Sequence, residues 1–228
     1  MNESTKSKPF WGPVEKEATR GKGIDIGCGP DPVTPDARRF DKEDGDANRA
    51  SEYVKEQFDF VYSSHCLEHM HDPKAAIQDW WKLVKTGGYL FVLVPDEDLY
   101  EQGVFPSRFN DDHKATFTIS KAKSWSPLSH NVLELGQSLA GGEIVSLQLQ
   151  DRNYDRSLMS FGKAEPGLFS RLLARLYCLL RGRVAESKLK ALRRAVVTYY
   201  PLDQTSDPGR AQAQIQLIVK KGSETLPK

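Results

Sequence analysis

Two glycines and a carboxylate near the start of the chain are the residues whose spacing points most directly to chemistry. The apolar stretch Gly23–Ile26 contains Asp25 and runs straight into Gly27, Cys28 and Gly29. Because glycine has no Cβ, a ligand can approach the backbone closely at such a turn. In open α/β sheets, nucleotide-like ligands bind at the carboxyl ends of parallel strands. The stretch therefore predicts a nucleotide-like binding loop.

Histidines offer a second possible chemistry, because His65, Glu68 and His69 match the H-x-x-E-H pattern of one class of zinc peptidases. Zinc would need both histidines on one helix face, a third ligand and an open position. Here the pattern directly follows a predicted strand, and a helix begins only after Asp72 and Pro73. The peptidase interpretation is therefore not favoured, and no metal site is predicted.

Composition sets limits on the class of protein. The 228 residues are 39% hydrophobic and 28% charged, which predicts a single domain over 1–228 with room for a core. A net charge of +1 gives no argument for nucleic acid, and we do not expect that partner. No apolar run reaches the roughly 18–20 residues of a membrane span. Residues 1–8 lack the apolar core of a signal peptide, and the three cysteines lack zinc-type spacing, so we expect reduced thiols in a cytoplasmic protein.

The elements that position the reactive residues alternate between strands and helices. Runs of apolar and β-branched residues predict strands at 23–26, 37–40, 58–62, 89–94, 143–149 and 212–219. Asp72 and Pro73 suit the N-terminus of a helix that Gly87 and Gly88 would end. A strand–helix–strand unit of this kind is a parallel crossover. Residues 1–20 are expected to be a flexible lead.

The order of these motifs resembles the class I S-adenosylmethionine (SAM)-dependent methyltransferases of the small-molecule type. The resemblance covers residues 22–95 densely and the rest thinly, and it rests on Asp25–Pro30, Gly45–Ala47, Phe58–Tyr62, Leu67–His69 and Leu83–Gly88. It implies a doubly wound, Rossmann-like α/β sheet of seven mostly parallel strands with an antiparallel last strand. It also implies a transferase that uses SAM and releases S-adenosylhomocysteine (SAH).

The resemblance further implies which residues bind the cofactor. Gly27, Cys28 and Gly29 would pass close to the methionine part of SAM, and Asp25 would hold that loop. Asp41, after the second strand, is the candidate for the ribose hydroxyls, because a carboxylate accepts both protons strongly. The segment before Asp41 is short and rich in proline, so Asp36 and Asp44 compete with it. The other cofactor candidates are Asp46 and Ala47 beside adenine and Ser63, Ser64 and His65 under the sulfonium.

The segment 95–114 follows the strand at 89–94 and should lie above the reactive methyl group. We select His113 as general base or substrate binder, since histidine titrates near neutral pH, and His69 is the second candidate. Arg108 suits an anionic or hydroxyl-rich acceptor. We interpret the acids of this segment as a solvated loop; the alternative is a divalent ion held by Asp96, Asp98, His113 and a substrate. The remaining substrate-binding candidates are Asp96, Tyr100 and Asn110.

Positive charge is concentrated late in the chain. Between Arg152 and Arg194 there are eleven Lys or Arg against three Asp or Glu. We interpret 152–208 as a basic helical insertion between the last two strands, with a leucine-rich helix at 167–199. Three interpretations of this helix are open. We prefer a helix that covers the sheet or forms a homodimer. The alternatives are a helix that lies on anionic lipid and one that neutralises the phosphates of a nucleic acid.

These observations predict an enzyme that transfers a methyl group from SAM to an acceptor hydroxyl on a sugar, glycan or lipid-linked saccharide, as in polysaccharide biosynthesis. The polar segment 95–114 and the basic, leucine-rich insertion motivate this choice of acceptor. A small metabolite or natural product is the alternative acceptor. A non-catalytic SAM-fold partner or accessory module is the alternative from another class.

Overall fold

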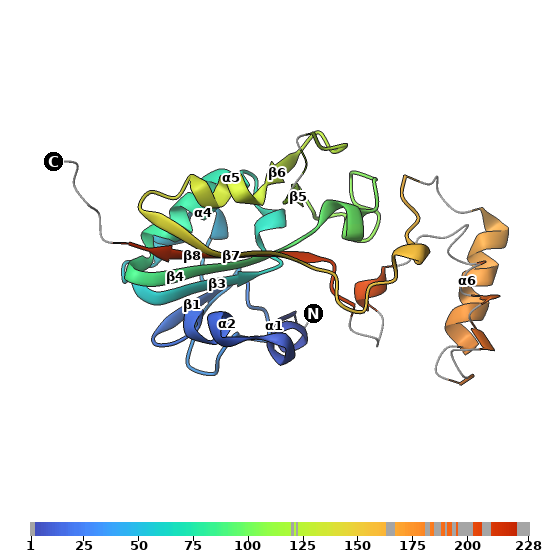
Figure 1. Ribbon diagram of the computed structural model, residues 1–228, viewed down its shortest axis with the longest axis horizontal. Coiled ribbons are helices and arrows are strands. Elements are labelled where there is room, and N and C mark those ends of the chain that lie inside the picture. The colour runs from blue at the N-terminus through green and yellow to red at the C-terminus, as the bar shows by residue number, and fades with distance from the viewer. Residues whose placement is uncertain are drawn as a thin grey trace.

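The computed structural model describes residues 3–119, 121, 123–162, 167–180, 183–184, 188–189, 191–192, 195, 203–206 and 211–222. A six-stranded sheet in the order β2-β1-β3-β4-β8-β7 forms its centre (Figure 1). Its strands are β1 (Gly23–Ile26), β2 (Arg38–Phe40), β3 (Phe58–Ser64), β4 (Val84–Pro95), β7 (Gly142–Gln150) and β8 (Gln214–Lys221). Strands β1 to β4 are parallel, whereas β8 is antiparallel to β4 and β7. The six predicted strands and the antiparallel last strand are confirmed.

The expectation of seven strands is wrong, because the described sheet has six. After β2 the chain turns directly into two short helical segments, η2 (Ala47–Arg49) and α3 (Ala50–Tyr53). Asp46 caps η2 by accepting the Asn48 N–H at 2.9 Å. A capped helical turn satisfies the backbone locally, so this segment adds no edge strand beyond β2.

Helices cover both faces of the sheet, as expected for a doubly wound fold. Helices α4 (Pro73–Lys82) and α5 (Val132–Gln137) lie on one face, and α1 (Glu3–Ser7) and α2 (Pro13–Ala18) lie on the other (Figure 1). The remaining elements are η1 (Lys8–Phe10), η3 (Leu67–His69), η4 (Glu97–Glu101), a small parallel pair of β5 (Thr116–Thr118) and β6 (Ser129–Asn131), η5 (Arg156–Leu158), α6 (Leu168–Leu180) and η6 (Gln204–Ser206).

Helix α4 begins where the sequence predicts and ends earlier. Asp72 accepts the Ala75 N–H at 3.0 Å and Pro73 is the first helical residue. The helix ends at Lys82, and Gly87 and Gly88 lie within β4 instead of at the helix end. A Cβ at Gly88 would lie 2.6 Å from the Asp59 carbonyl oxygen, so this glycine permits close contact with the neighbouring strand.

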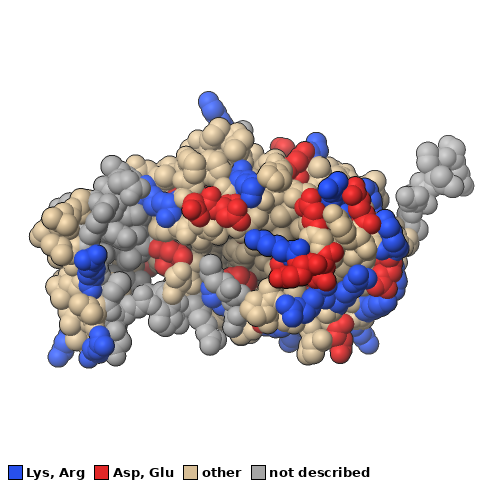
Figure 2. Space-filling view, turned by 180° about the vertical axis from the view of Figure 1, so that it is seen from behind, with Lys and Arg blue, Asp and Glu red and all other residues tan. Residues whose placement is uncertain are grey.

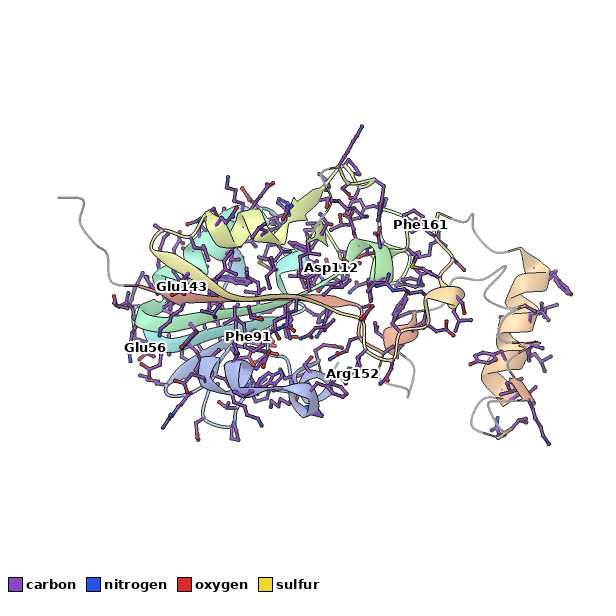
Figure 3. The ribbon with its side chains drawn as sticks, in the orientation of Figure 1. Glu56, Phe91, Asp112, Glu143, Arg152 and Phe161 are labelled. Atoms are coloured by element: carbon purple, nitrogen blue, oxygen red, sulfur yellow. The ribbon has the colours of Figure 1, made fainter. Side chains whose placement is uncertain are left out.

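The N-terminal segment is not a flexible lead in this structure. Ser4, Ser7, Glu15 and Ala18 are buried on helices α1 and α2. The Trp11 ring lies 6.1 Å from the Tyr62 ring and 5.5 Å from the Phe91 ring, measured between centroids. Phe91, labelled in Figure 3, lies between the sheet and these helices. Aromatic packing of this kind fixes the segment against the sheet.

The segment after β4 is held by one buried carboxylate, that of Glu97 on η4. Glu97 is fully buried and accepts hydrogen bonds from Thr116 Oγ1 (3.2 Å), Lys121 Nζ (2.8 Å), Ser124 Oγ (2.8 Å) and Ser129 Oγ (2.5 Å). The described residues of the segment 95–130 therefore form an ordered layer, with a polar centre, over the ends of the strands.

Replacing Glu97 with alanine is expected to lower the free energy of unfolding by about 3 kcal/mol, because the three buried or half-buried hydroxyl groups and Lys121 lose the fully buried carboxylate that they share. Urea denaturation measures this change. The matched control is Glu43→Ala, since Glu43 is exposed and its loss should change stability by no more than about 0.5 kcal/mol. Equal effects of the two substitutions would contradict the role given to Glu97.

The insertion between β7 and β8 carries α6, which lies apart from the sheet at one end of the molecule (Figure 1). The predicted helix at 167–199 is observed over Leu168–Leu180, and part of the remainder lies outside the described residues. One side of α6 packs through Tyr177 and Leu173 against Leu189. Within the described ranges, no helix combines the length and the apolar character needed to cross a bilayer.

Candidate active site

Two adjoining cavities lie where the parallel strands end. Strands β1, β2 and β3 end at Ile26, Phe40 and Ser64, and the residues that follow them line the cavities. The larger cavity has a volume of about 760 Å³ and the smaller about 230 Å³. Both are lined by the same four residues where they meet, namely Gly27, His65, His69 and Asn110. A cleft of this combined size suits a nucleotide-sized cofactor together with part of a second substrate.

The glycine loop lies against the wall of both cavities. Gly27 has a φ of +78°, and a Cβ there would lie 2.6 Å from both Cβ and Sγ of Cys66. The Gly27 N–H donates to the Phe40 carbonyl at 2.8 Å, and the Gly29 N–H donates to Asp41 Oδ2 at 2.7 Å. Only glycine fits this backbone conformation and this space without strain, so the loop is shaped for close approach of a ligand.

Asp25 contacts the segment that follows the glycine loop. Its side chain is 1% exposed, and Oδ2 accepts the Val33 N–H at 2.6 Å. Burial raises the pKa of this carboxyl to about 7, although the hydrogen bond from Val33 favours the charged form. Asp25 also lines the smaller cavity. Asp25 thus connects β1 to the backbone at Val33, and its role in holding the glycine loop stays a prediction.

The larger cavity contains the residues proposed for the nucleoside part of SAM. Asp41, Asp46 and Ala47 line it together with Phe40 and Cys66. Of the three candidates for the ribose acid, only Asp41 lines either cavity. Asp44 accepts the Asp41 N–H at 2.9 Å and so fixes that residue, and Asp36 is exposed. The geometry therefore favours Asp41 over its competitors.

The smaller cavity brings together a group of histidines and buried carboxylates. His113 Nδ1–H donates to Glu101 Oε1 at 2.6 Å, and both side chains are buried. The His113 ring stacks on Tyr100 with 5.3 Å between centroids and meets the His69 ring edge-on at 5.1 Å. His69 Nδ1 lies 3.1 Å from Asp112 Oδ2. His69, His113, Tyr100 and Asn110, all selected from sequence, thus line one cavity.

His65 lies at the junction of the cavities in the left-handed backbone region, with a φ of +54°. Its Nδ1 lies 3.3 Å from Glu68 Oε1, and its Nε2–H donates to Gln214 Oε1 at 2.9 Å. Burial disfavours the imidazolium, but the hydrogen bond and charge of Glu68 outweigh burial and raise the pKa of His65 to about 9. Burial likewise opposes ionisation of Glu68, yet His65 keeps the pKa of that carboxyl below its usual value.

This ion pair predicts a dependence of stability on pH. Because the folded-state pKa of His65 is about 9 and an unfolded histidine has a pKa of about 6.5, the folded protein binds the proton more tightly. The stabilisation is complete below about pH 6.5 and is lost as pH rises through 9. The variant His65→Asn, which tolerates positive φ, should therefore be less stable than the unmodified protein at pH 6 and nearly equal to it above pH 9. Urea denaturation across this range is the measurement, and a pH-independent difference would contradict it.

Several candidates lie away from the cavities. Asp96 caps η4 by accepting the Asp98 and Leu99 N–H groups at 3.1 and 3.0 Å, and burial raises its pKa to about 6. Ser63 Oγ donates to the Ile26 carbonyl at 2.9 Å inside the sheet. Arg108 is half-buried and lines neither of the two cavities. The remaining candidates, Cys28 and Ser64, do line the smaller one.

Sequence reasoning did not predict two buried acids of the site or the N-terminal residues that line the smaller cavity. Glu68 and Glu101 are 1% and 0% exposed and contact the histidines of the cavity. Glu3 and Ser4 of α1 also line it. The motif around Glu68 was visible in sequence, whereas Glu101 lies among several acids after β4 and only its contact with His113 distinguishes it.

Comparison with known proteins identifies the family of this chain. A family model described as a methyltransferase domain matches residues 10–125. The chain resembles a solved SAM-dependent methyltransferase from Archaeoglobus fulgidus at 12% identity, covering 96% of this chain and 92% of that one, with a TM-score of 0.47. It resembles TehB from Haemophilus influenzae at 13% identity over 96% and 67% of the two chains, with a TM-score of 0.46.

A third solved structure is the plantazolicin methyltransferase BamL in complex with a triazolic desmethylPZN analog and SAH, at 15% identity over 96% and 81% of the two chains and a TM-score of 0.42. No curated protein gives a significant match. The family model spans more than half of the chain, and the glycine loop and cavities described above fit its cofactor. The chain belongs to the methyltransferase-domain family and is a SAM-dependent methyltransferase.

Proposed function

We propose that this methyltransferase acts on a hydroxyl group of a saccharide. The observation that carries the proposal is the buried Glu101–His113 pair, which opens on the cavity beside the glycine loop. A hydroxyl oxygen must lose its proton as it attacks a methyl group, and a histidine held by a carboxylate is suited to assist that loss. His113 and His69 are the residues proposed to act on the acceptor hydroxyl.

The main task of the protein in this reaction is to position the acceptor and SAM. SAM supplies a methyl group on a positively charged sulfur, which is already activated. Gly27 and Gly29 would hold the methionine part, Asp41 would accept the ribose hydroxyls, and Asp46 and Ala47 would flank the adenine. Alignment of the acceptor oxygen with the methyl group then supplies several kcal/mol of the barrier, on the order of 7 to 11 in well-oriented cases.

The lining of the smaller cavity supports a hydroxyl-rich acceptor. Besides the histidines, it contains the side chains of Glu3, Ser4, Asp31, Asn110 and Thr205. Hydroxyl, amide and carboxylate groups of this kind hydrogen-bond to sugar hydroxyls. Tyr100 provides an aromatic surface at the same place. A flat, apolar natural product would leave many of these polar groups without partners.

Helix α6 supports an acceptor that is held at a membrane. Its exposed apolar residues are Leu168, Phe169, Leu172, Leu176 and Leu179, with Leu168 76% exposed. Arg175 and Arg183 are exposed in the same region, and Figure 2 shows Lys and Arg side chains among uncharged ones at this end of the molecule. An apolar stripe bordered by cations is typical of helices that lie on anionic lipid. We therefore propose a lipid-linked saccharide as the acceptor.

Co-sedimentation with phospholipid vesicles tests the membrane contact. We expect binding to vesicles that contain anionic lipid and little binding to pure phosphatidylcholine. The double variant Leu172→Glu, Leu176→Glu should weaken binding by at least about tenfold, because each charge must be desolvated. Leu128→Glu is the control, since Leu128 is exposed on the loop before β6. Equal binding by all three proteins would contradict the role of α6.

Acceptor identity is tested by transfer of a labelled methyl group from SAM. Lipid-linked oligosaccharides, free oligosaccharides, phenols and amines are offered in parallel, and the site of methylation is read by mass spectrometry. Methylation of a saccharide hydroxyl supports the proposal. Methylation of amines or phenols alone overturns the choice of acceptor. SAM binding without transfer to any class would favour a non-catalytic partner module.

A further inference from the structure

We propose that Glu68, His69 and His113 bind a divalent transition-metal ion. The use of the ion in the reaction rests on the proposed function, whereas its binding does not. One ligand atom from each of the three side chains lies within 4.8 Å of the other two. His113 Nε2 is 3.9 Å from Glu68 Oε1. Two imidazoles and one carboxylate that leave other positions open are a recurrent set for catalytic zinc and for non-haem iron.

Both histidines carry the outer contacts that metal-binding histidines show. His113 uses Nδ1 on Glu101 Oε1 at 2.6 Å, which leaves Nε2 for an ion. His69 uses Nδ1 on Asp112, with 3.1 Å to Oδ2 and 3.2 Å to the backbone oxygen, which also leaves Nε2. A carboxylate on the second ring nitrogen fixes the tautomer and raises the basicity of the coordinating nitrogen. A general base needs one such pair, and this cavity has two.

Glu68 supplies a second, independent observation. Its side chain is 1% exposed, and Oε1 is engaged by His65. Oε2 is buried and has no hydrogen-bond partner among the described residues. A carboxylate oxygen without a partner in a buried site is costly, and coordination of a cation removes that cost. Lys114 and Ala115 donate only to the backbone carbonyl of Glu68, so they leave Oε2 without a donor.

The donor set indicates the class of ion and its use. Imidazole nitrogens suit zinc, iron, cobalt or nickel better than magnesium, which prefers oxygen ligands. The three protein ligands line the cavity of the proposed acceptor, so its hydroxyl oxygen can occupy an open position. Coordination lowers the pKa of a bound hydroxyl. With an ion bound, His113 and His69 would assist loss of this proton as ligands of the ion and not as bases. The O–H proton would be released to solvent as the new O–CH₃ bond forms, and the S–CH₃ bond would break to leave neutral SAH.

Titration with Co²⁺ tests the site without any assay of methyl transfer. Protein freed of metal with a chelator is titrated with Co²⁺, and visible absorption bands report coordination by histidine. We expect saturation at one ion per chain and no displacement by Mg²⁺. Glu68→Gln and His69→Gln should each weaken binding by about 100-fold or more, and Glu101→Gln, which removes an outer contact, by about 10- to 100-fold. His130→Gln is the control, because His130 lies on β6 outside both cavities.

Calorimetric titration of SAH into the same samples shows that each variant is folded. Absence of cobalt bands in protein that still binds SAH overturns the proposal, as does binding that the Glu68, His69 and Glu101 substitutions leave unchanged. Cobalt binding at this site in a protein that methylates no saccharide supports the metal site and overturns the acceptor assignment. Saccharide methylation at full rate by metal-free protein supports the acceptor assignment and overturns the role given to the ion in the reaction.

Discussion

Replacing Gly27 with alanine is expected to abolish SAM binding, with an increase in Kd of about 100-fold or more, equivalent to about 3 kcal/mol. The φ of +78° at this position is strained for any residue with a Cβ, and the added carbon would lie 2.6 Å from the Cys66 side chain. Relief of this contact must move the loop or Cys66 into the cavity that the cofactor occupies. Calorimetric titration of SAM and of SAH into the purified variant measures the effect.

Gly87 provides the matched control for backbone strain. Its φ is +82°, and a Cβ there would meet nothing within 4 Å. Gly87→Ala should therefore have a similar backbone strain without the clash, and it should bind SAM as the unmodified protein does. If both variants lost SAM binding equally, the effect would come from general destabilisation, and the placement of the cofactor beside Gly27 would be wrong.

His113→Gln is expected to lower kcat by about 10²- to 10⁴-fold, because the acceptor hydroxyl loses the group that assists departure of its proton. The Kd for SAM should stay within a fewfold of its original value, since His113 lines only the smaller cavity and not the larger one. Steady-state kinetics with the saccharide acceptor, beside calorimetry with SAM, separate the two quantities.

Two further variants show whether a loss of kcat in His113→Gln is specific to the Glu101–His113 pair. His130→Gln should leave both kcat and SAM binding unchanged. Glu101→Gln, which keeps the shape of the side chain that contacts His113 at 2.6 Å, should lower kcat with little effect on SAM binding. A normal kcat in His113→Gln would show that this residue has a packing role beside Tyr100 instead of a role in the reaction.

The glycine loop and its strand were predictable because their signals are local. A short apolar strand, two glycines and a carboxylate in seven residues define β1 and its turn, and the chain forms them where expected. Strands rich in β-branched and aromatic residues were predictable for the same reason. The resemblance overcounted the strands, because Asp46 and the residues after it form capped helical turns.

The rest of the site depends on contacts between distant segments. Glu101 and Glu97 lie four residues apart on η4, yet one contacts His113 and the other anchors the layer that contains β5 and β6. No periodicity or spacing distinguishes these roles. The helices at 3–18 were missed because their sequence is polar, and their order derives from Trp11 packing on Tyr62 and Phe91.

The position of β8 has a consequence for how the protein is made. Val94 of β4 pairs with Ile215 of β8, and among the described strands β8 lies between β4 and β7. During synthesis β4 therefore keeps an apolar edge unpaired until the whole insertion has left the ribosome, and an open edge of this kind invites intermolecular pairing. Gln214 of β8 also holds His65. Pairing of β8 with β4 thus completes the sheet and brings Gln214 to His65 in the same late step of folding.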